Sequence, residues 1–139
     1  MRLITKSVVV FVFMGASASA LADTDGDALA RRFLYCANVY DFFYKYLSKH
    51  EPTSKGLNGY REGKNMFWLA AATASHGDFL IREKDTATQR VVDVLEQEKR
   101  DKSNLMDAEA RSCLDSLQND AIPLLQKSRG SGKTESLSQ

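Results

Sequence analysis

The sequence predicts an all-α fold, a four-helix bundle of up-down-up-down topology with one disulfide between helices. Apolar residues recur at spacings of three and four along most of the chain, whereas strand-like alternation is scarce. Pro52 and Pro123 are the only two prolines, and turn-forming segments divide the periodic region into four stretches of helical length. Short connections between such helices favour antiparallel neighbours. The two cysteines, Cys36 and Cys113, fall on the apolar stripes of the first and the last helix.

The first 22 residues have the pattern of a secretory signal peptide. Arg2 and Lys6 form a short positive segment, an apolar run follows from Val8 to Met14, and Ala20-Leu21-Ala22 offers an A-x-A cleavage site, with a cut two residues earlier as the alternative. Even when it is extended to Ala22, the apolar part has 15 residues, fewer than the roughly 17–25 that a membrane-spanning helix needs. We therefore expect export to the periplasm or the exterior, with no stable membrane anchor after cleavage.

Removal of residues 1–22 leaves 117 residues, the size of one domain. Arg2 and Lys6 leave with the signal peptide, so 17 basic residues face 18 acidic ones and the net charge becomes about −1. A nearly neutral chain gives no electrostatic reason to expect binding to nucleic acid or to an anionic membrane surface. We expect a helical domain over residues 23–127. Because residues 128–139 are rich in Ser, Gly and Lys, we expect a disordered tail there.

The first helix is expected from about Asp27 to His50. Asp25 or Asp27 can cap its start, because a carboxylate there accepts free backbone N–H groups, and Pro52 ends it. Its apolar stripe has the spacings 4, 3, 4, 3 and 4 and consists of Leu29, Phe33, Cys36, Tyr40, Phe43 and Leu47.

The second helix is expected from Leu57 or Tyr60 to His76, with Gly77 as a left-handed residue that ends it. Gly59 and Gly63 indicate either a close approach of helices or, in the interpretation favoured by the sequence, a weakly formed first turn. The expected core positions are Tyr60, Met66, Phe67, Ala70, Ala71 and Ala74.

The third and fourth helices follow with similar signals. Asp78 can cap a third helix that reaches about Asp101, and Ser103 or Asn104 can cap the fourth. Pro123 removes a backbone donor, which predicts a kink or break around Asn119-Asp120. The expected apolar stripes are Leu80, Ala87, Val91, Val94 and Leu95 in the third helix, and Met106, Ala110, Cys113, Leu117, Ala121 and Leu124 in the fourth.

The positions of the cysteines predict that Cys36 and Cys113 are bonded to each other. An even number of cysteines in an exported protein favours pairing, and the first and fourth helices of this topology are neighbours. Because 77 residues separate the two, the loop-entropy model gives the bond roughly 4.5 kcal/mol of stabilisation at most.

No motif in the sequence predicts catalysis, a cofactor or a metal site. The segment Gly130–Thr134 resembles the end of a phosphate-binding loop, but Lys127 stands where that motif needs glycine. His50 and His76 end different helices, and with both cysteines in a disulfide no third strong metal ligand is evident. C-x-x-C-H and G-x-S-x-G are both absent. We therefore expect a protein that is not an enzyme and holds no cofactor.

A second apolar stripe on the first helix is the one candidate binding surface. It consists of Tyr35, Val39, Phe42 and Tyr46, and it widens the apolar arc of the helix to about 200°, whereas a bundle helix needs little more than 100°. One interpretation is a central helix that packs against three others, with tyrosine hydroxyls at the rim. The other is an exposed patch that binds a protein partner, a second copy of the chain or an apolar ligand.

The segments around the two cysteines, Phe33-Leu34-Tyr35-Cys36-Ala37-Asn38-Val39-Tyr40 and Arg111-Ser112-Cys113-Leu114-Asp115, resemble those of a loose class of small exported all-helical bacterial proteins. Within that class the layout is similar to that of the periplasmic immunity proteins of type VI secretion amidases. The resemblance implies binding rather than catalysis, and it transfers no functional residue. The expected function is that of a periplasmic interaction protein, inhibitor- or immunity-like, that engages another protein or a second copy through the first helix. A carrier of a small apolar ligand is the alternative, and an enzyme without a known motif comes third.

Overall fold

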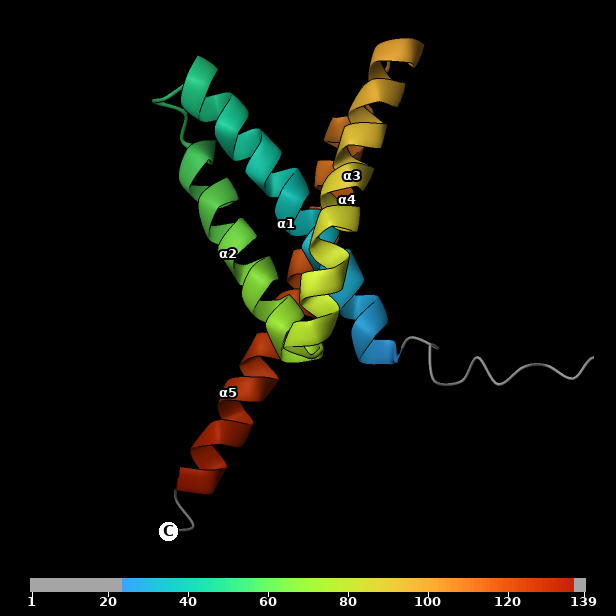
Figure 1. Cartoon of the computed structure of the whole chain (residues 1–139). Coiled ribbons are helices and arrows are strands. Elements are labelled where there is room, and N and C mark those ends of the chain that lie inside the picture. The colour runs from blue at the N-terminus through green and yellow to red at the C-terminus, as the bar shows by residue number, and fades with distance from the viewer. Residues whose placement is uncertain (1–23, 137–139) are drawn as a thin grey trace, which may run out of the picture.

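The structure, a computed structural model, describes residues 24–136, and the elements in this range are helices. In chain order they are α1 (Asp25–His50), α2 (Gly56–Ala74), α3 (Gly77–Asp101), α4 (Leu105–Ser116), the π-helical turn η2 (Leu117–Ala121) and α5 (Ile122–Ser136). The first four helices alternate in direction, and α5 extends past the lower end of the bundle (Figure 1). The prediction of a four-helix, up-down-up-down bundle is confirmed. The predicted signal peptide lies outside the described residues.

Helix α1 is the centre of the bundle, since it contacts α2, α3 and α4, whereas α2 and α3 contact each other only weakly. The α1–α2 hairpin and the α3–α4 hairpin consequently diverge toward the upper end of the molecule (Figure 1). Cys36 of α1 and Cys113 of α4 form the predicted disulfide, with their Cα atoms 5.4 Å apart. Because both side chains are fully buried, the bond joins the two hairpins from inside the core.

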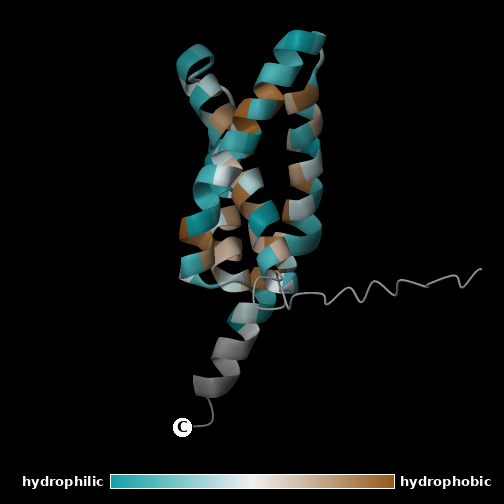
Figure 2. Ribbon diagram, turned by 45° about the vertical axis from the view of Figure 1, so that its right-hand side comes forward, coloured by the Kyte–Doolittle hydropathy of each residue, from teal (hydrophilic) through white to brown (hydrophobic). Residues whose placement is uncertain are grey.

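The core lies where α1 meets its three neighbours, and Figure 2 shows hydrophobic residues concentrated on the faces that the helices turn toward one another. Its largest fully buried side chains are Phe33, Phe67, Leu34, Val39, Cys36 and Cys113. Two residues predicted for the core, Leu29 and Met66, are instead exposed. Met66 stands about 100° around the helix from Phe67, beyond the narrow face that α2 turns to α1.

Helix α1 begins with a capping box. The side-chain oxygen of Thr24 accepts the Asp27 N–H at 3.1 Å, and a carboxylate oxygen of Asp27 accepts the Thr24 N–H at 3.3 Å. The N-cap residue is therefore Thr24 rather than Asp25 or Asp27, but the carboxylate of Asp27 does accept a free backbone N–H at the helix start, as predicted. The Ser75 hydroxyl also donates to Asp27, which ties the start of α1 to the end of α2. The hydrogen bond from Ser75, together with those involving Thr24, holds the pKa of Asp27 below its ordinary value.

Two further helix ends differ from the prediction. Gly77 does not end α2 in a left-handed conformation but is the first residue of α3. The N-cap residue of α3 is His76, not Asp78. Asn104 occupies the N-cap position of α4 as predicted but makes no side-chain capping bond. The left-handed residue in the described chain is Lys102, which ends α3 with φ 50°. A residue other than glycine in this conformation costs roughly 1–2 kcal/mol.

The helix irregularity predicted near Asn119-Asp120 is confirmed as the π-helical turn η2. The Ile122 N–H bonds to the Leu117 carbonyl, a pairing of residues five apart. Pro123 has no N–H to offer the Asn119 carbonyl, so the regular pattern of α4 cannot continue through it. After the turn, α5 runs from Ile122 to Ser136. The disordered tail expected over residues 128–139 stays a prediction.

Candidate binding cleft

Two neighbouring hollows lie between the diverging hairpins, and we call them together the cleft. The Tyr60 hollow, of about 580 Å³, is lined by residues of α1, α2, α4 and η2 that include Tyr60, Leu114 and Leu117. The Phe42 hollow, of about 590 Å³, lies between α1 and the junction of α3 with α4. Asp107, in the first turn of α4, lines both hollows. Each volume falls within the roughly 300–1,000 Å³ of small-molecule sites.

A continuous series of ring contacts, the aromatic ladder, runs from the core into this cleft. Its members in order are Phe33, Phe67, Tyr40, Tyr60, Phe43, Phe42, Tyr46 and His50, with successive ring centroids between 4.6 and 6.3 Å apart. The ladder passes from fully buried Phe33 to Tyr46, which is 49% exposed. Aromatic pairs at these separations stabilise one another beyond the area that they bury. The rings of the cleft are therefore extensions of the hydrophobic core.

The four residues of the predicted binding surface have different environments in the structure. Val39 is fully buried and belongs to the core, so its assignment to an exposed patch was wrong. Tyr35 is half-buried, and it donates a hydrogen bond to Glu109; burial, followed by this hydrogen bond, raises its pKa. Phe42 is half-buried and lines the Phe42 hollow, while Tyr46 lines the same hollow and is substantially exposed. The central position of α1 explains the broad apolar arc, because three neighbouring helices cover most of it.

The rim of the Phe42 hollow is polar. Lys99 lies in the last turn of α3, Lys102 directly follows that helix, and both side chains border the hollow. In the described part of the chain neither lysine has an ion-pair partner. Glu98, on the same rim, accepts the Met106 backbone N–H at 3.3 Å and so occupies one free donor of the α4 N-terminus. The buried hydroxyl oxygen of Ser103 lacks a hydrogen-bond partner among the described residues.

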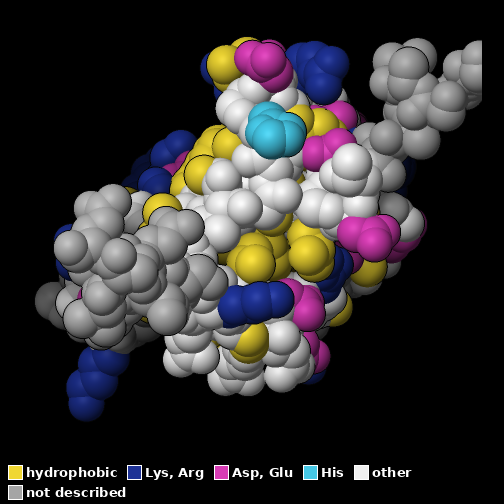
Figure 3. All heavy atoms as spheres, turned by 90° about the horizontal axis from the view of Figure 1, so that it is seen from below, with side chains coloured by type: hydrophobic (Ala, Val, Ile, Leu, Met, Phe, Trp, Pro, Cys, Tyr) yellow, Lys and Arg dark blue, Asp and Glu magenta, His cyan; other side chains and the backbone are white. Residues whose placement is uncertain are grey.

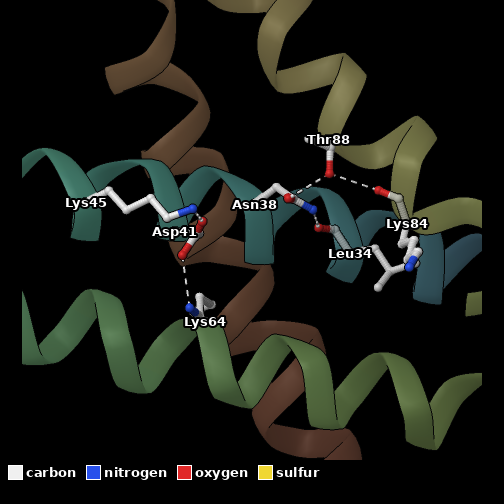
Figure 4. A network of polar contacts seen from close by, with 7 residues as sticks. All are labelled: Leu34, Asn38, Asp41, Lys45, Lys64, Lys84 and Thr88. Carbon is white, nitrogen blue, oxygen red and sulfur yellow. Dashed lines mark hydrogen bonds and ion pairs between the residues drawn. The ribbon is translucent and has the colours of Figure 1, made fainter. Parts of the chain in front are cut away.

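A separate polar network holds α1 to its neighbours outside the cleft (Figure 4). Asp41 accepts hydrogen bonds from Lys64 of α2 at 2.9 Å and from Lys45 at 2.7 Å, and the Thr88 hydroxyl of α3 donates to Asn38 at 3.1 Å. Burial alone would raise the pKa of Asp41, but the two ammonium groups outweigh it and hold that pKa below its ordinary value. Every side chain in this network has a protein partner, so we assign the network a structural role.

The two tyrosines that line the Tyr60 hollow, Tyr40 and Tyr60, have environments that keep them neutral. Burial, followed by the nearby phenol of Tyr60, raises the pKa of Tyr40, and burial, followed by the Asp107 carboxylate, raises the pKa of Tyr60. Neutral phenols can donate hydrogen bonds but do not act as bases or nucleophiles. Among residues 24–136, no group of three or more His, Cys, Asp or Glu side chains is placed to hold a metal ion. What the cleft offers chemically is apolar contact with a polar rim.

The lower end of the bundle differs from the cleft. In Figure 3, which shows this end, hydrophobic side chains reach the surface as small groups interrupted by Lys, Arg, Asp and Glu side chains. Mixed charges of this kind are typical of a solvated surface. The cleft at the other end is therefore the better candidate for a binding site.

Sequence reasoning did not find the cleft itself. It assigned Phe43, Tyr60 and Met106, which line the hollows, to core stripes. The periodicity of each helix was visible, but the divergence of the hairpins that opens a space between them carries no sequence signal. The chain shows no match to any protein-family model, curated protein or solved structure. Within residues 24–136, no helix combines the length and the apolar character needed to cross a membrane.

Proposed function

We propose that this protein is a non-enzymatic interaction protein of the periplasm, and that it holds an apolar segment of a partner protein in the cleft. The observation that carries the proposal is the course of the aromatic ladder, which leaves the core and brings half-exposed Tyr46 to the surface of the Phe42 hollow. Aromatic residues and methionine are favoured anchors in protein interfaces. The signal peptide predicted from the sequence, together with the disulfide, supports a periplasmic location.

The role of the cleft in binding can be tested by truncating exposed side chains on its α1 side and on its α4 side, because their loss leaves the core intact. Tyr46 of α1 is 49% exposed and Leu114 of α4 is 44% exposed, and they line different hollows. We expect the double variant Tyr46→Ala with Leu114→Ala to fold normally and to lose the partner in a pull-down from periplasmic extract. Ile81→Ala is the matched control, because Ile81 of α3 is 67% exposed and lies outside the residues that line the cleft. A partner that the cleft variant retains, or that the control loses, would contradict the proposal.

A carrier of a small apolar ligand is the second candidate function. The specific observation in its favour is the volume of the Phe42 hollow, about 590 Å³, together with its lining of Phe42, Phe43, Leu95 and Met106. Native mass spectrometry of protein purified from periplasm separates the two candidates. A co-purifying small mass supports the carrier, and a mass equal to the mature chain alone contradicts it.

A further inference from the structure

We infer that the Phe42 hollow is a site for a small amphiphile with an apolar tail and a single anionic head group, a carboxylate or a comparable anion. The inference deepens the second candidate function and rests on it. It depends on two features of the hollow: an apolar floor and two lysines on its rim.

The floor of the hollow suits an alkyl or aryl group. Phe42, Phe43 and Tyr46 contribute rings from α1, while Leu95 of α3 and Met106 of α4 close the opposite side. Met106 is almost fully buried, and Phe42, Phe43 and Leu95 are half-buried against the core. The floor is thus held by core packing, and an apolar group placed on it would lose contact with water.

The rim supplies positive charge that the protein itself does not use. Lys99 and Lys102 border the hollow without an ion-pair partner among the described residues. Of the two carboxylates that line the hollow, that of Glu98 accepts the Met106 N–H at the start of α4, and that of Asp107 stands in the first turn of the same helix.

Lys102 is the most informative of these residues. Its backbone is left-handed, with φ 50°, a conformation that favours glycine at the end of a helix. Position 102 is occupied by lysine instead. The residue therefore has a strained backbone and also places an ammonium group on the rim of the hollow. A glycine at position 102 would relieve the strain and would also remove the charge. The substitution is therefore expected to stabilise the fold while it weakens the binding of an anion.

The experiment compares three probes that have chains of ten carbons and an anionic, a neutral or a cationic head group. Binding of decanoate, decanol and decyltrimethylammonium to the full mature protein is measured by calorimetry at pH 7 and low salt. We expect decanoate to bind at least tenfold more tightly than the other two, and we expect this preference to weaken as salt is added. Free decanoic acid and an acylated head group such as a decanoyl phosphate are then compared to identify the source of the anion.

Variants test whether the lysines cause the preference. Lys102→Gly alone should keep or raise the melting temperature while it weakens decanoate binding severalfold, and Lys99→Gln with Lys102→Gly should reduce the preference for decanoate to within twofold. Lys84→Gln is the matched control, because Lys84 is an exposed lysine of the same helix, about 22 Å away along its axis. Equal binding of all three probes, or an unchanged preference in the double variant, would overturn the inference and leave the carrier function standing. Failure of every probe to bind would overturn both.

Discussion

Gly63 of α2 lies directly against the ring of Tyr40 of α1. A Cβ atom built on Gly63 would overlap that ring, with the Tyr40 Cδ2 only 2.6 Å away, and Tyr40 itself is 5% exposed. The pair of glycines near the start of α2 therefore marks a close approach of two helices at Gly63, and the interpretation of a weakly formed first turn was wrong. The close approach sets the position of Tyr40, whose ring contacts both Phe67 and Tyr60 in the aromatic ladder.

Gly63→Ala is expected to destabilise the protein by about 1–3 kcal/mol, because the added methyl group must displace a buried ring. Gly59→Ala is the matched control, since nothing lies within 4 Å of a Cβ at that position. In the control, alanine should stabilise α2 by about 0.5–1 kcal/mol through its higher helix propensity. Urea unfolding of both variants measures the two effects, and a destabilising Gly59→Ala would contradict the explanation.

Replacement of both Cys36 and Cys113 by alanine is expected to lower the free energy of unfolding by about 2–5 kcal/mol. The bond closes a loop of 77 residues and links the two hairpins, so its loss frees the unfolded chain and leaves the hairpins joined by packing alone. Thermal unfolding should show a decrease in Tm of at least about 8 °C. Alkylation and mass measurement of protein taken from intact periplasm check the bond directly, and two free thiols would refute its formation there.

Val39→Ala and Tyr46→Ala are expected to differ although both residues belong to one stripe of α1. Val39 is fully buried, so its truncation should cost about 1–3 kcal/mol of stability. Tyr46 lies at the exposed end of the aromatic ladder, and its truncation should cost less than about 1 kcal/mol. Equal losses in chemical unfolding would contradict the arrangement of α1 described above.

The contribution of Asp41 to stability is expected to depend on pH in one direction. Because its folded pKa lies below the ordinary value of 3.8, the stabilisation from its ion pairs is fully present above that pH and is lost as the pH falls through the folded pKa. The difference in unfolding free energy between the native protein and Asp41→Asn should therefore be constant near neutrality and should shrink below pH 3.8. A difference that grows with acidity would have the wrong sign.

Lys102→Gly is expected to raise the free energy of unfolding by about 1 kcal/mol, because glycine adopts the left-handed backbone without steric cost. Asp101→Gly, one residue earlier in the right-handed last turn of α3, is the control and should lower stability by about 0.5–1 kcal/mol. Both substitutions remove one charged side chain and add one glycine, so opposite signs in the same unfolding assay identify the backbone conformation as the cause.

The helices and the disulfide were predictable from sequence because their causes are local or periodic. Apolar spacing located four helices to within a few residues, Pro123 located the irregularity of η2, and the stripe positions of Cys36 and Cys113 predicted their bond. Helix ends were less predictable, since Thr24 capped α1 in place of the neighbouring aspartates and a lysine took the left-handed position.

The tertiary structure alone decided which apolar surfaces are covered and where space remains. Apolar periodicity predicts that a residue faces a neighbouring helix, but it does not predict how many helices surround that residue. Val39 is buried and Tyr46 is exposed because three helices surround the middle of α1, whereas the hairpins have already diverged at its end. The cleft likewise depends on the angle between the two hairpins, which results from contacts between residues distant in sequence such as the Cys36–Cys113 disulfide.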